Sequence, residues 1–145
     1  MKKVSEIQVS YSNQGDKRIT VKNSETVFEV ALAHWDKNII EYQEEVKLML
    51  LNRANVILGI YDLSKGGVAG CSVDLKIILS IALKSNSSSI VLLHNHPSGK
   101  LEPSESDKLL TKKLKEACEI VDLVLLDHLI ITKDSFYSFN DNSIL

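Results

Sequence analysis

The pattern of apolar and polar positions in the N-terminal part of the chain predicts two strands and a helix. Residues 4–11 carry apolar side chains at short intervals and predict a first strand, and residues 18–22 predict a second strand after a turn at 13–16. Ser24 is the expected N-cap of a helix over residues 25–35, because apolar residues recur there with helical spacing.

From residue 44 onward the pattern alternates strands with helices. Residues 44–51 and 56–63 predict two strands, and Asp74 is the expected cap of a helix that ends near residue 83. The uninterrupted apolar run at 90–93 is typical of a strand buried on both faces of a sheet. Three elements complete the prediction: a helix from Ser104 to about residue 119, a strand over 123–132 and a short strand over 136–139. This alternation predicts an α/β (α+β) sandwich with a mixed sheet covered by helices.

Length and composition fit one compact domain. The chain has 145 residues, of which 44% are hydrophobic and 25% charged, as in an ordinary globular protein. We expect residues 1–34, with their strands and helix, to pack on a main domain over residues 35–145. The net charge of −2 gives nucleic-acid binding no support, since that function usually needs a concentrated positive surface, but it leaves the function open.

Neither a membrane segment nor a thiolate metal site is expected. The longest apolar run, at 48–51, is too short to cross a bilayer, and the N-terminus turns polar at once, unlike a signal peptide. Cys71 and Cys118 form no Cys-x-x-Cys pair. Both suit small buried residues of a reduced protein, so we expect a cytoplasmic location.

Two histidines follow the buried strand at 90–93 and are candidates for metal ligands. His94 and His96 flank a single residue, so both rings can project from the end of the strand toward one point. Active sites of α/β sheets gather at the carboxyl ends of strands, and histidine is the commonest zinc ligand. From these two residues alone, a metal site and a structural role both stay open.

Asp107 is the candidate third ligand. It precedes Leu110 by three residues and so shares the predicted buried face of its helix, where a carboxylate needs a cation or hydrogen bonds. The alternative is that Ser104 and Asp107 form a capping box. Capping would then compete with metal ligation for the same carboxylate.

Strand parity selects the candidate base from three neighbouring glutamates, Glu41, Glu44 and Glu45. Glu44 shares one face of its strand with apolar residues, whereas Glu45 shares the other face with Lys47, which we expect at the surface. A catalytic zinc site has three protein ligands and an open position for water. Glu44 is the residue we expect beside that water.

These residues together resemble a known signature. Glu44, the segment His94-x-His96-Pro97 and the segment Ser104-x-x-Asp107 are similar to the motif of the JAMM (JAB/MPN) metalloproteases. The segments HNHPSG at 94–99 and LDHLI at 126–130 resemble, more narrowly, the RadC-like branch of that family.

The resemblance covers residues 35 to 141 approximately and implies both fold and chemistry. It implies a cytidine-deaminase-like, three-layer α/β/α sandwich in which His94, His96 and Asp107 bind Zn²⁺. By the same resemblance, Glu44 takes a proton from the zinc-bound water that attacks an amide carbonyl and passes it to the leaving amine, and Ser104 hydrogen-bonds the oxyanion. The implied substrate is a peptide or isopeptide, and a homodimer is open because relatives often pair.

The sequence also allows functions other than a zinc hydrolase. Full-length relatives carry a helix-hairpin-helix region, but only about 35 residues precede the similarity here, so we expect the JAB domain alone. A DNA-repair-associated protein of the RadC type that acts with nucleic acid is the first alternative, and a catalytically inactive scaffold is the second. A nucleobase deaminase would need Pro-Cys-x-x-Cys, and a thermolysin-type protease would need His-Glu-x-x-His; the sequence has neither.

His128 and the loop at 63–71 are two further features near the predicted site. His128 is expected in the core or beside a ligand, where it or Asp127 would orient a ligating imidazole; a role as fourth ligand is the remaining reading. The glycine-containing loop at 63–71 is expected to border the site and to shape access to it.

Overall fold

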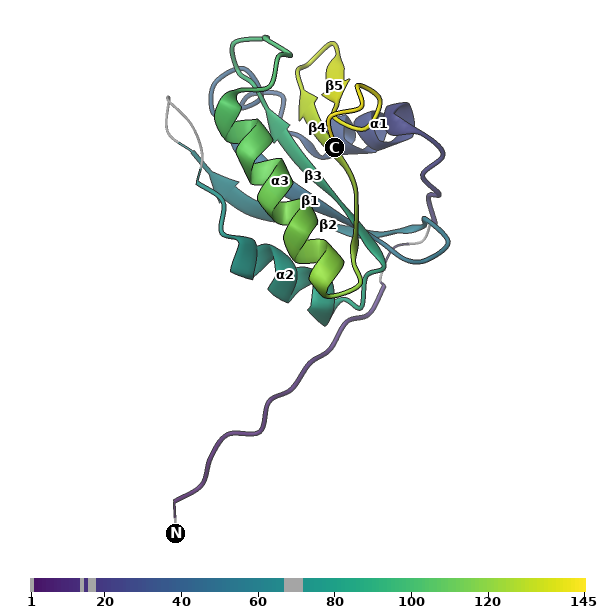
Figure 1. Cartoon of the computed structure of the whole chain (residues 1–145), viewed down its shortest axis with the longest axis vertical. Coiled ribbons are helices and arrows are strands. Elements are labelled where there is room, and N and C mark those ends of the chain that lie inside the picture. The colour runs from purple at the N-terminus through teal and green to yellow at the C-terminus, as the bar shows by residue number, and fades with distance from the viewer. Residues whose placement is uncertain (1, 14, 16–17, 67–71) are drawn as a thin grey trace.

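The computed structural model describes residues 2–13, 15, 18–66 and 72–145. Its helices and strands follow one another in the chain as α1 (Ser24–His34), β1 (Glu45–Leu51), β2 (Ile57–Lys65), α2 (Leu75–Lys84), β3 (Ser89–Asn95), α3 (Glu105–Ile120), β4 (Val124–Ile131) and β5 (Phe136–Ser138). The strands form one five-stranded sheet in the order β2-β1-β3-β4-β5 (Figure 1). Only the β3–β4 pair is parallel among these neighbours, so the sheet is mixed, as predicted.

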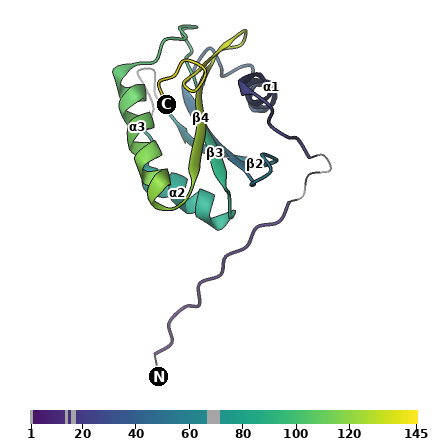
Figure 2. The same ribbon diagram turned by 45° about the vertical axis from the view of Figure 1, so that its right-hand side comes forward.

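Helices cover both faces of the sheet and make three layers. α2 and α3 lie on one side and α1 lies on the other (Figure 2). The core between the sheet and α2 and α3 consists of Val46, Leu48, Leu50, Ile78, Ala82, Ile90, Leu92, Leu114, Cys118, Leu123 and Leu125. The core on the α1 side consists of Val27, Ala31, Trp35, Ile40, Met49, Leu51, Val91, Leu93, Leu129 and Ile131. The predicted α/β/α sandwich is confirmed.

The alternation of side chains along β1 explains how the two cores form. Successive residues of a strand point to opposite faces, so Leu48 and Leu50 enter one core while Met49 and Leu51 enter the other. β1 and β3 are buried along their whole length, which accounts for their nearly continuous apolar sequence. Each fully buried Leu, Ile or Val contributes about 1.5–3 kcal/mol of transfer free energy.

Glu45 and Lys47 correct one expectation about this strand. They do share the face opposite Glu44, but each is only 5% exposed, so Lys47 is not a surface residue. The Lys47 ammonium lies 3.4 Å from the Glu45 carboxylate and 2.6 Å from that of Asp62, and it sits over the Trp35 ring. The layer that contains α1 covers this end of the strand, and the paired charges satisfy one another.

The helix starts follow the predicted chemistry with one shift. Asp74 caps α2, because its carboxylate accepts from the Lys76 N–H at 2.9 Å. The cap of α1 is Asn23 rather than Ser24, since the Asn23 side chain accepts from the backbone of Thr26. Ser24 is the first helical residue, and its hydroxyl instead donates to Asp141.

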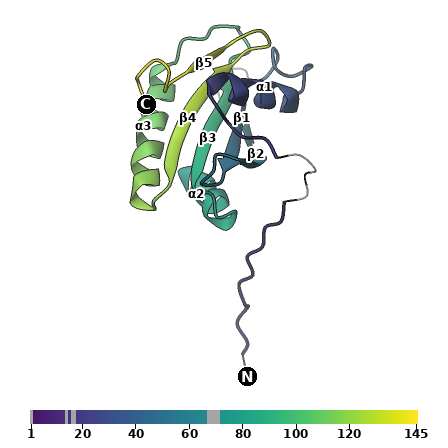
Figure 3. The same ribbon diagram turned by 90° about the vertical axis from the view of Figure 1, so that its right-hand side faces the viewer.

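The predicted N-terminal strands do not form. Residues 2–13 have no regular structure and run away from the body of the protein (Figures 1 and 3). Val4 is 95% exposed and Ile7 84%, because no strand among the described residues pairs with this segment. The expected second strand is reduced to a single bridge between Thr20 and Val56. The turn expected at 13–16 lies largely outside the described residues.

Two smaller findings concern the membrane and the cysteines. Within the described ranges, no helix combines the length and the apolar character that crossing a bilayer would require. Cys118 is buried and not in a disulfide, as expected. Cys71 lies outside the described residues.

Candidate metal centre

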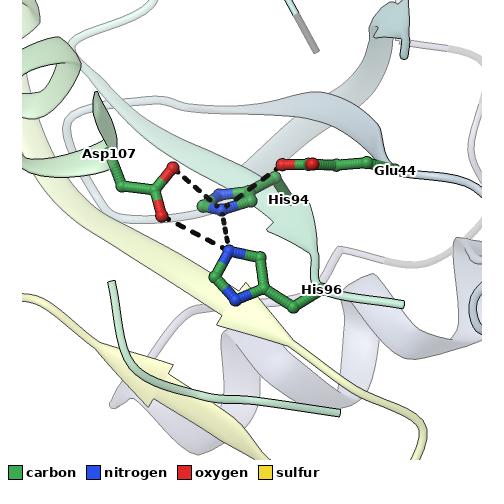
Figure 4. Close-up of side chains that lie close together, drawn as sticks. All are labelled: Glu44, His94, His96 and Asp107. Atoms are coloured by element: carbon green, nitrogen blue, oxygen red, sulfur yellow. Dashed lines mark hydrogen bonds and ion pairs between the residues drawn. The ribbon is translucent and has the colours of Figure 1, made fainter. Parts of the chain in front are cut away.

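Three elements bring four potential ligands to one point. His94 lies near the end of β3 and His96 directly follows it, while Asp107 lies in the first turn of α3. Glu44 directly precedes β1, and the antiparallel register pairs Val46 with His94, so the beginning of β1 lies beside the end of β3. All four side chains converge in Figure 4. One ligand atom from each lies within 4.8 Å of the others.

The distances within this group suit a tetrahedral metal ion. The Asp107 carboxylate has one oxygen 3.4 Å from His94 Nε2 and the other 3.3 Å from His96 Nε2. A tetrahedral zinc with bonds of about 2.0–2.2 Å holds neighbouring ligand atoms about 3.3–3.6 Å apart. The two histidine Nε2 atoms are 2.9 Å apart and would separate by about 0.4 Å to reach that spacing. Nitrogen and carboxylate donors are also the chemical types that zinc accepts.

Glu44 is the fourth member of the group and lies farther from His94 than Asp107 does. Its carboxylate is 3.8 Å from His94 Nε2, farther than Asp107, and its side chain is 20% exposed. Of the three glutamates considered from the sequence, Glu44 is the member of this group. The parity argument therefore selected the glutamate that faces the histidines.

Burial and charge act on the ionisation of this group. Burial raises the pKa of Asp107, but hydrogen bonds to His94 and His96 and the nearby imidazole charge outweigh it, so its pKa lies well below the ordinary value. Burial lowers the pKa of His96, yet its contacts with Asp107 and the Lys100 carbonyl prevail and the pKa lies above 6.5. The metal-free site thus favours a carboxylate beside a protonated imidazole, an arrangement that a cation can replace.

Asp107 and Ser104 form the capping box that the sequence offered as an alternative. The Ser104 hydroxyl accepts from the Asp107 N–H at 3.0 Å, and an Asp107 oxygen accepts from the Ser104 N–H at 2.8 Å. Capping does not exclude ligation, because the other carboxylate oxygen faces His94. The expected competition between capping and ligation therefore stays a prediction, with one Asp107 oxygen in the box and the other facing His94. The Ser104 hydroxyl accepts within the box and retains its own proton for donation.

A backbone carbonyl and a third histidine hold the two imidazole rings. His96 Nδ1 lies 2.8 Å from the carbonyl of Lys100, which turns Nε2 toward the centre of the group. His94 Nδ1 lies 2.7 Å from Nε2 of His128. His128 is fully buried and burial lowers its pKa well below 6.5. It contacts a candidate ligand rather than joining the group as a fourth one.

Asp127 does not orient a candidate ligand ring, the role that the sequence suggested for it or His128; instead it holds the backbone. Its carboxylate accepts from the backbone N–H of His128, from the Ser138 hydroxyl and from the Asn140 N–H. Burial raises the pKa of Asp127 despite these hydrogen bonds. The residue ties β4 to the segment after β5, and among the described residues its carboxylate bonds His128, Ser138 and Asn140 rather than His94 or His96.

Two residues that support the candidate site were not predicted from the sequence. Asn95 is fully buried between the two candidate ligand histidines; its side chain donates to the carbonyls of Ile40 and Gln43 and accepts from the N–H of Glu45. These bonds hold the backbone on both sides of Glu44. A polar residue in an otherwise apolar strand was the available signal.

Thr111 is the second missed residue. It is buried four positions after Asp107, one helical turn along the same face, and its hydroxyl lies 2.6 Å from His128 Nδ1. The loop at 63–71 is described only to Gly66, whose carbonyl accepts from Gln43, next to Glu44. Its remaining residues lie outside the described part of the chain.

Comparison with known proteins agrees with this arrangement. The model of the RadC-like JAB domain matches residues 21–144. A UPF0758 protein of Flavobacterium johnsoniae is 46% identical over 101 residues, which make up 70% of this chain and 44% of the relative. A UPF0758 protein of Porphyromonas gingivalis is 41% identical over 104 residues, 71% of this chain and 46% of the relative. One of Neisseria gonorrhoeae is 35% identical over 121 residues, 83% of this chain and 52% of the relative.

This chain therefore spans about half the length of the relatives that it matches. The family model, in contrast, extends over nearly all of it and includes all four residues of the candidate metal group. The chain belongs to the RadC-like JAB domain family.

Proposed function

We propose that this chain is a zinc-dependent hydrolase of amide bonds, with His94, His96 and Asp107 as the metal ligands. The observation that carries the proposal is the convergence of four donor side chains within 4.8 Å at spacings close to those of a tetrahedral site. Zinc bound there would supply Lewis acidity and lower the pKa of water to about 7. The substrate class we propose is a peptide or an isopeptide.

Glu44 is the proposed general base and Ser104 the proposed oxyanion donor. The Glu44 carboxylate stands beside His94 without being the nearest oxygen to it, a position that suits proton transfer between water and a leaving amine. Ser104 lies at the start of α3, where its hydroxyl proton and the positive end of the helix dipole favour negative charge.

The wider context forms part of the same proposal. We place the protein in a reducing, cytoplasmic compartment; the support is that Cys118 is a buried free thiol. A homodimer, nucleic-acid binding and a role in DNA repair are alternatives that the sequence leaves open.

Metal content measured by mass spectrometry tests the site. We expect about one zinc per chain in the wild-type protein after dialysis against zinc, and a loss of that zinc in His96→Ala. Retention of a normal fold in the variant is checked by circular dichroism. Absence of metal from the folded wild-type protein would overturn the proposal and favour a scaffold.

Hydrolysis of a peptide and isopeptide library then tests the chemistry. We expect Glu44→Gln to retain zinc but to lose about 10²–10⁴-fold in rate. Glu41→Gln is the matched control, because Glu41 belongs to the same loop but its carboxylate pairs with Lys133 at the surface. Equal rates for the two variants would remove Glu44 from the mechanism.

A further inference from the structure

A continuous chain of hydrogen bonds links His94 to helix α3. His94 Nδ1 lies 2.7 Å from His128 Nε2, and His128 Nδ1 lies 2.6 Å from the Thr111 hydroxyl. That hydroxyl donates to the backbone carbonyl of Asp107 at 2.7 Å. All three side chains are buried, with exposed fractions of 4% for His94, 0% for His128 and 2% for Thr111. The chain therefore starts at one candidate ligand and ends at the backbone of another.

The carbonyl at one end determines the direction of each hydrogen bond. A carbonyl oxygen only accepts, so Thr111 must donate its single proton to Asp107. The Thr111 oxygen is then free to accept, and its partner is His128 Nδ1, which must carry a proton. A neutral imidazole has one N–H, so His128 Nε2 is left as an acceptor for His94 Nδ1–H.

The opposite end of the chain leads to the same proton positions. His94 Nε2 faces His96 and Asp107, and as a ligand it must present a lone pair rather than a proton. The proton of a neutral His94 is then on Nδ1, which donates to His128 Nε2. The metal position and the helix carbonyl thus require one and the same set of protons.

Thr111 is needed because the hydrogen bond between His128 and His94 could otherwise run in either direction. With its proton on Nε2, His128 would donate to His94 Nδ1 and push the His94 proton onto the nitrogen that faces the site. Phe139 stacks on the His128 ring at 4.4 Å and holds its plane, but stacking does not distinguish the two nitrogens. His96 lacks this ambiguity, since its partner is a carbonyl that can only accept.

We propose that His128 and Thr111 are positioning residues that hold His94 in the tautomer with a free Nε2 lone pair, ready for a metal ion. The inference rests on the proposed zinc site and extends it to two residues outside the ligand group. Partners of ligating histidines typically change metal affinity by about 10–100-fold. Loss of the Thr111 hydroxyl is expected to fall in this range.

The tautomers are measured directly in the wild-type protein by long-range ¹H–¹⁵N NMR of the histidine rings. We expect the His128 proton on Nδ1 both before and after addition of zinc, and the His94 proton on Nδ1 once zinc is bound. A His128 proton on Nε2 in the metal-free protein would overturn the inference. Because this readout needs no metal, it is separable from the proposed function, which fails if the wild-type protein binds no zinc.

Zinc affinity of matched variants, measured by competition with a chelator, gives the second test. Thr111→Val keeps the shape of the side chain and removes the hydroxyl, and we expect zinc affinity to fall by about 10–100-fold. Thr111→Ser restores the hydroxyl and is expected to bind nearly as the wild type does. Ser89→Ala is the control, because Ser89 is a buried hydroxyl of β3 that has no hydrogen-bond partner among the described residues. Equal affinities of Thr111→Val and Ser89→Ala would overturn the inference.

Discussion

Asp107 belongs both to the capping box of α3 and to the candidate metal group, and its two oxygens make different contacts. One oxygen receives the Ser104 N–H and faces His96, and the other faces His94. The sequence predicted both the capping box and the ligand but treated them as rivals, because sequence spacing does not show how a carboxylate is turned. Asn95 and Thr111 were missed for a related reason: their partners lie 50 and 17 residues away in the chain.

At the residue scale, we predict that zinc affinity depends on the protonation of His96. Its pKa lies above 6.5 in the metal-free protein, and a protonated imidazole cannot bind zinc. Affinity should be constant above that raised pKa and fall by about tenfold per pH unit below it. Isothermal titration with zinc from pH 5.5 to 8.5 measures this dependence. An affinity that stays level down to pH 5.5 would contradict a role for His96 as ligand.

The same raised pKa predicts how metal-free stability changes with pH. A group whose folded pKa exceeds its unfolded value adds stability that is complete below the unfolded pKa and is lost as pH rises through the folded one. The contribution of His96 should therefore fade as pH rises through its raised pKa. Urea unfolding of the metal-free protein, compared with His96→Gln, detects it as a difference that shrinks toward pH 8.

At the scale of elements, the pattern of apolar residues in the sequence predicted nearly all strands of the sheet. It also predicted α2 and α3, the two helices that cover one face of the sheet. β3 was evident from its continuous apolar run, and α2 and α3 from their caps and apolar stripes. The N-terminal strand was wrong because its apolar residues have strand-like spacing but no partner strand. The local sequence pattern indicates that a segment can form a strand. Whether it does depends on pairing with another strand that is distant in the chain.

The start of α3 offers a prediction at this scale. Ser104→Ala removes the side chain that accepts from the Asp107 N–H and should lower the free energy of unfolding by about 1 kcal/mol. Ser106→Ala is the matched control, since Ser106 is an exposed residue inside the same first turn. Urea unfolding of metal-free protein compares the two. Equal losses would mean that the capping box does not stabilise the helix.

The loop before β1 offers another prediction at the scale of elements. Asn95→Ala leaves the carbonyls of Ile40 and Gln43 without their donor, and each unpaired buried group costs about 1–3 kcal/mol. We expect a clear loss of stability, measured by thermal unfolding. Asn52→Ala is the control and should cost much less, because the half-buried Asn52 side chain accepts only the local N–H groups of Ala54 and Val56. A loss of stability for Asn95→Ala no larger than for Asn52→Ala would contradict a stabilising role for the Asn95 hydrogen bonds.

At the scale of the whole molecule, the folded body begins close to α1, and residues 2–13 extend beyond it (Figure 3). This segment contacts the body through the Tyr11 hydroxyl, which donates to the Leu58 carbonyl. The sequence predicted that residues 1–34 pack on the domain. In the structure, the packing comes from α1, whose Val27 and Ala31 are buried against the sheet.

We therefore predict that removal of residues 2–11 changes the free energy of unfolding by no more than about 0.5 kcal/mol, as for a surface change. Removal of residues 2–34 takes away a core layer and should prevent folding. Urea unfolding and zinc content of the shorter deletion measure the effect. A loss above about 2 kcal/mol would show that the segment packs on the domain in solution, as its apolar pattern suggests.

The alternation at the end of β3 makes the chemistry of this protein depend on strand register. His94 and His96 turn toward the layer of α3, while Asn95 turns toward the loop that ends at Glu44. A slip by one residue would exchange the two sides, putting an amide among the carboxylates and two imidazoles under the loop. Ligands and base would be lost in the same step. Insertions and deletions that evolution accepts in the surface turns should therefore be absent from this strand, because no intermediate register retains even part of the site.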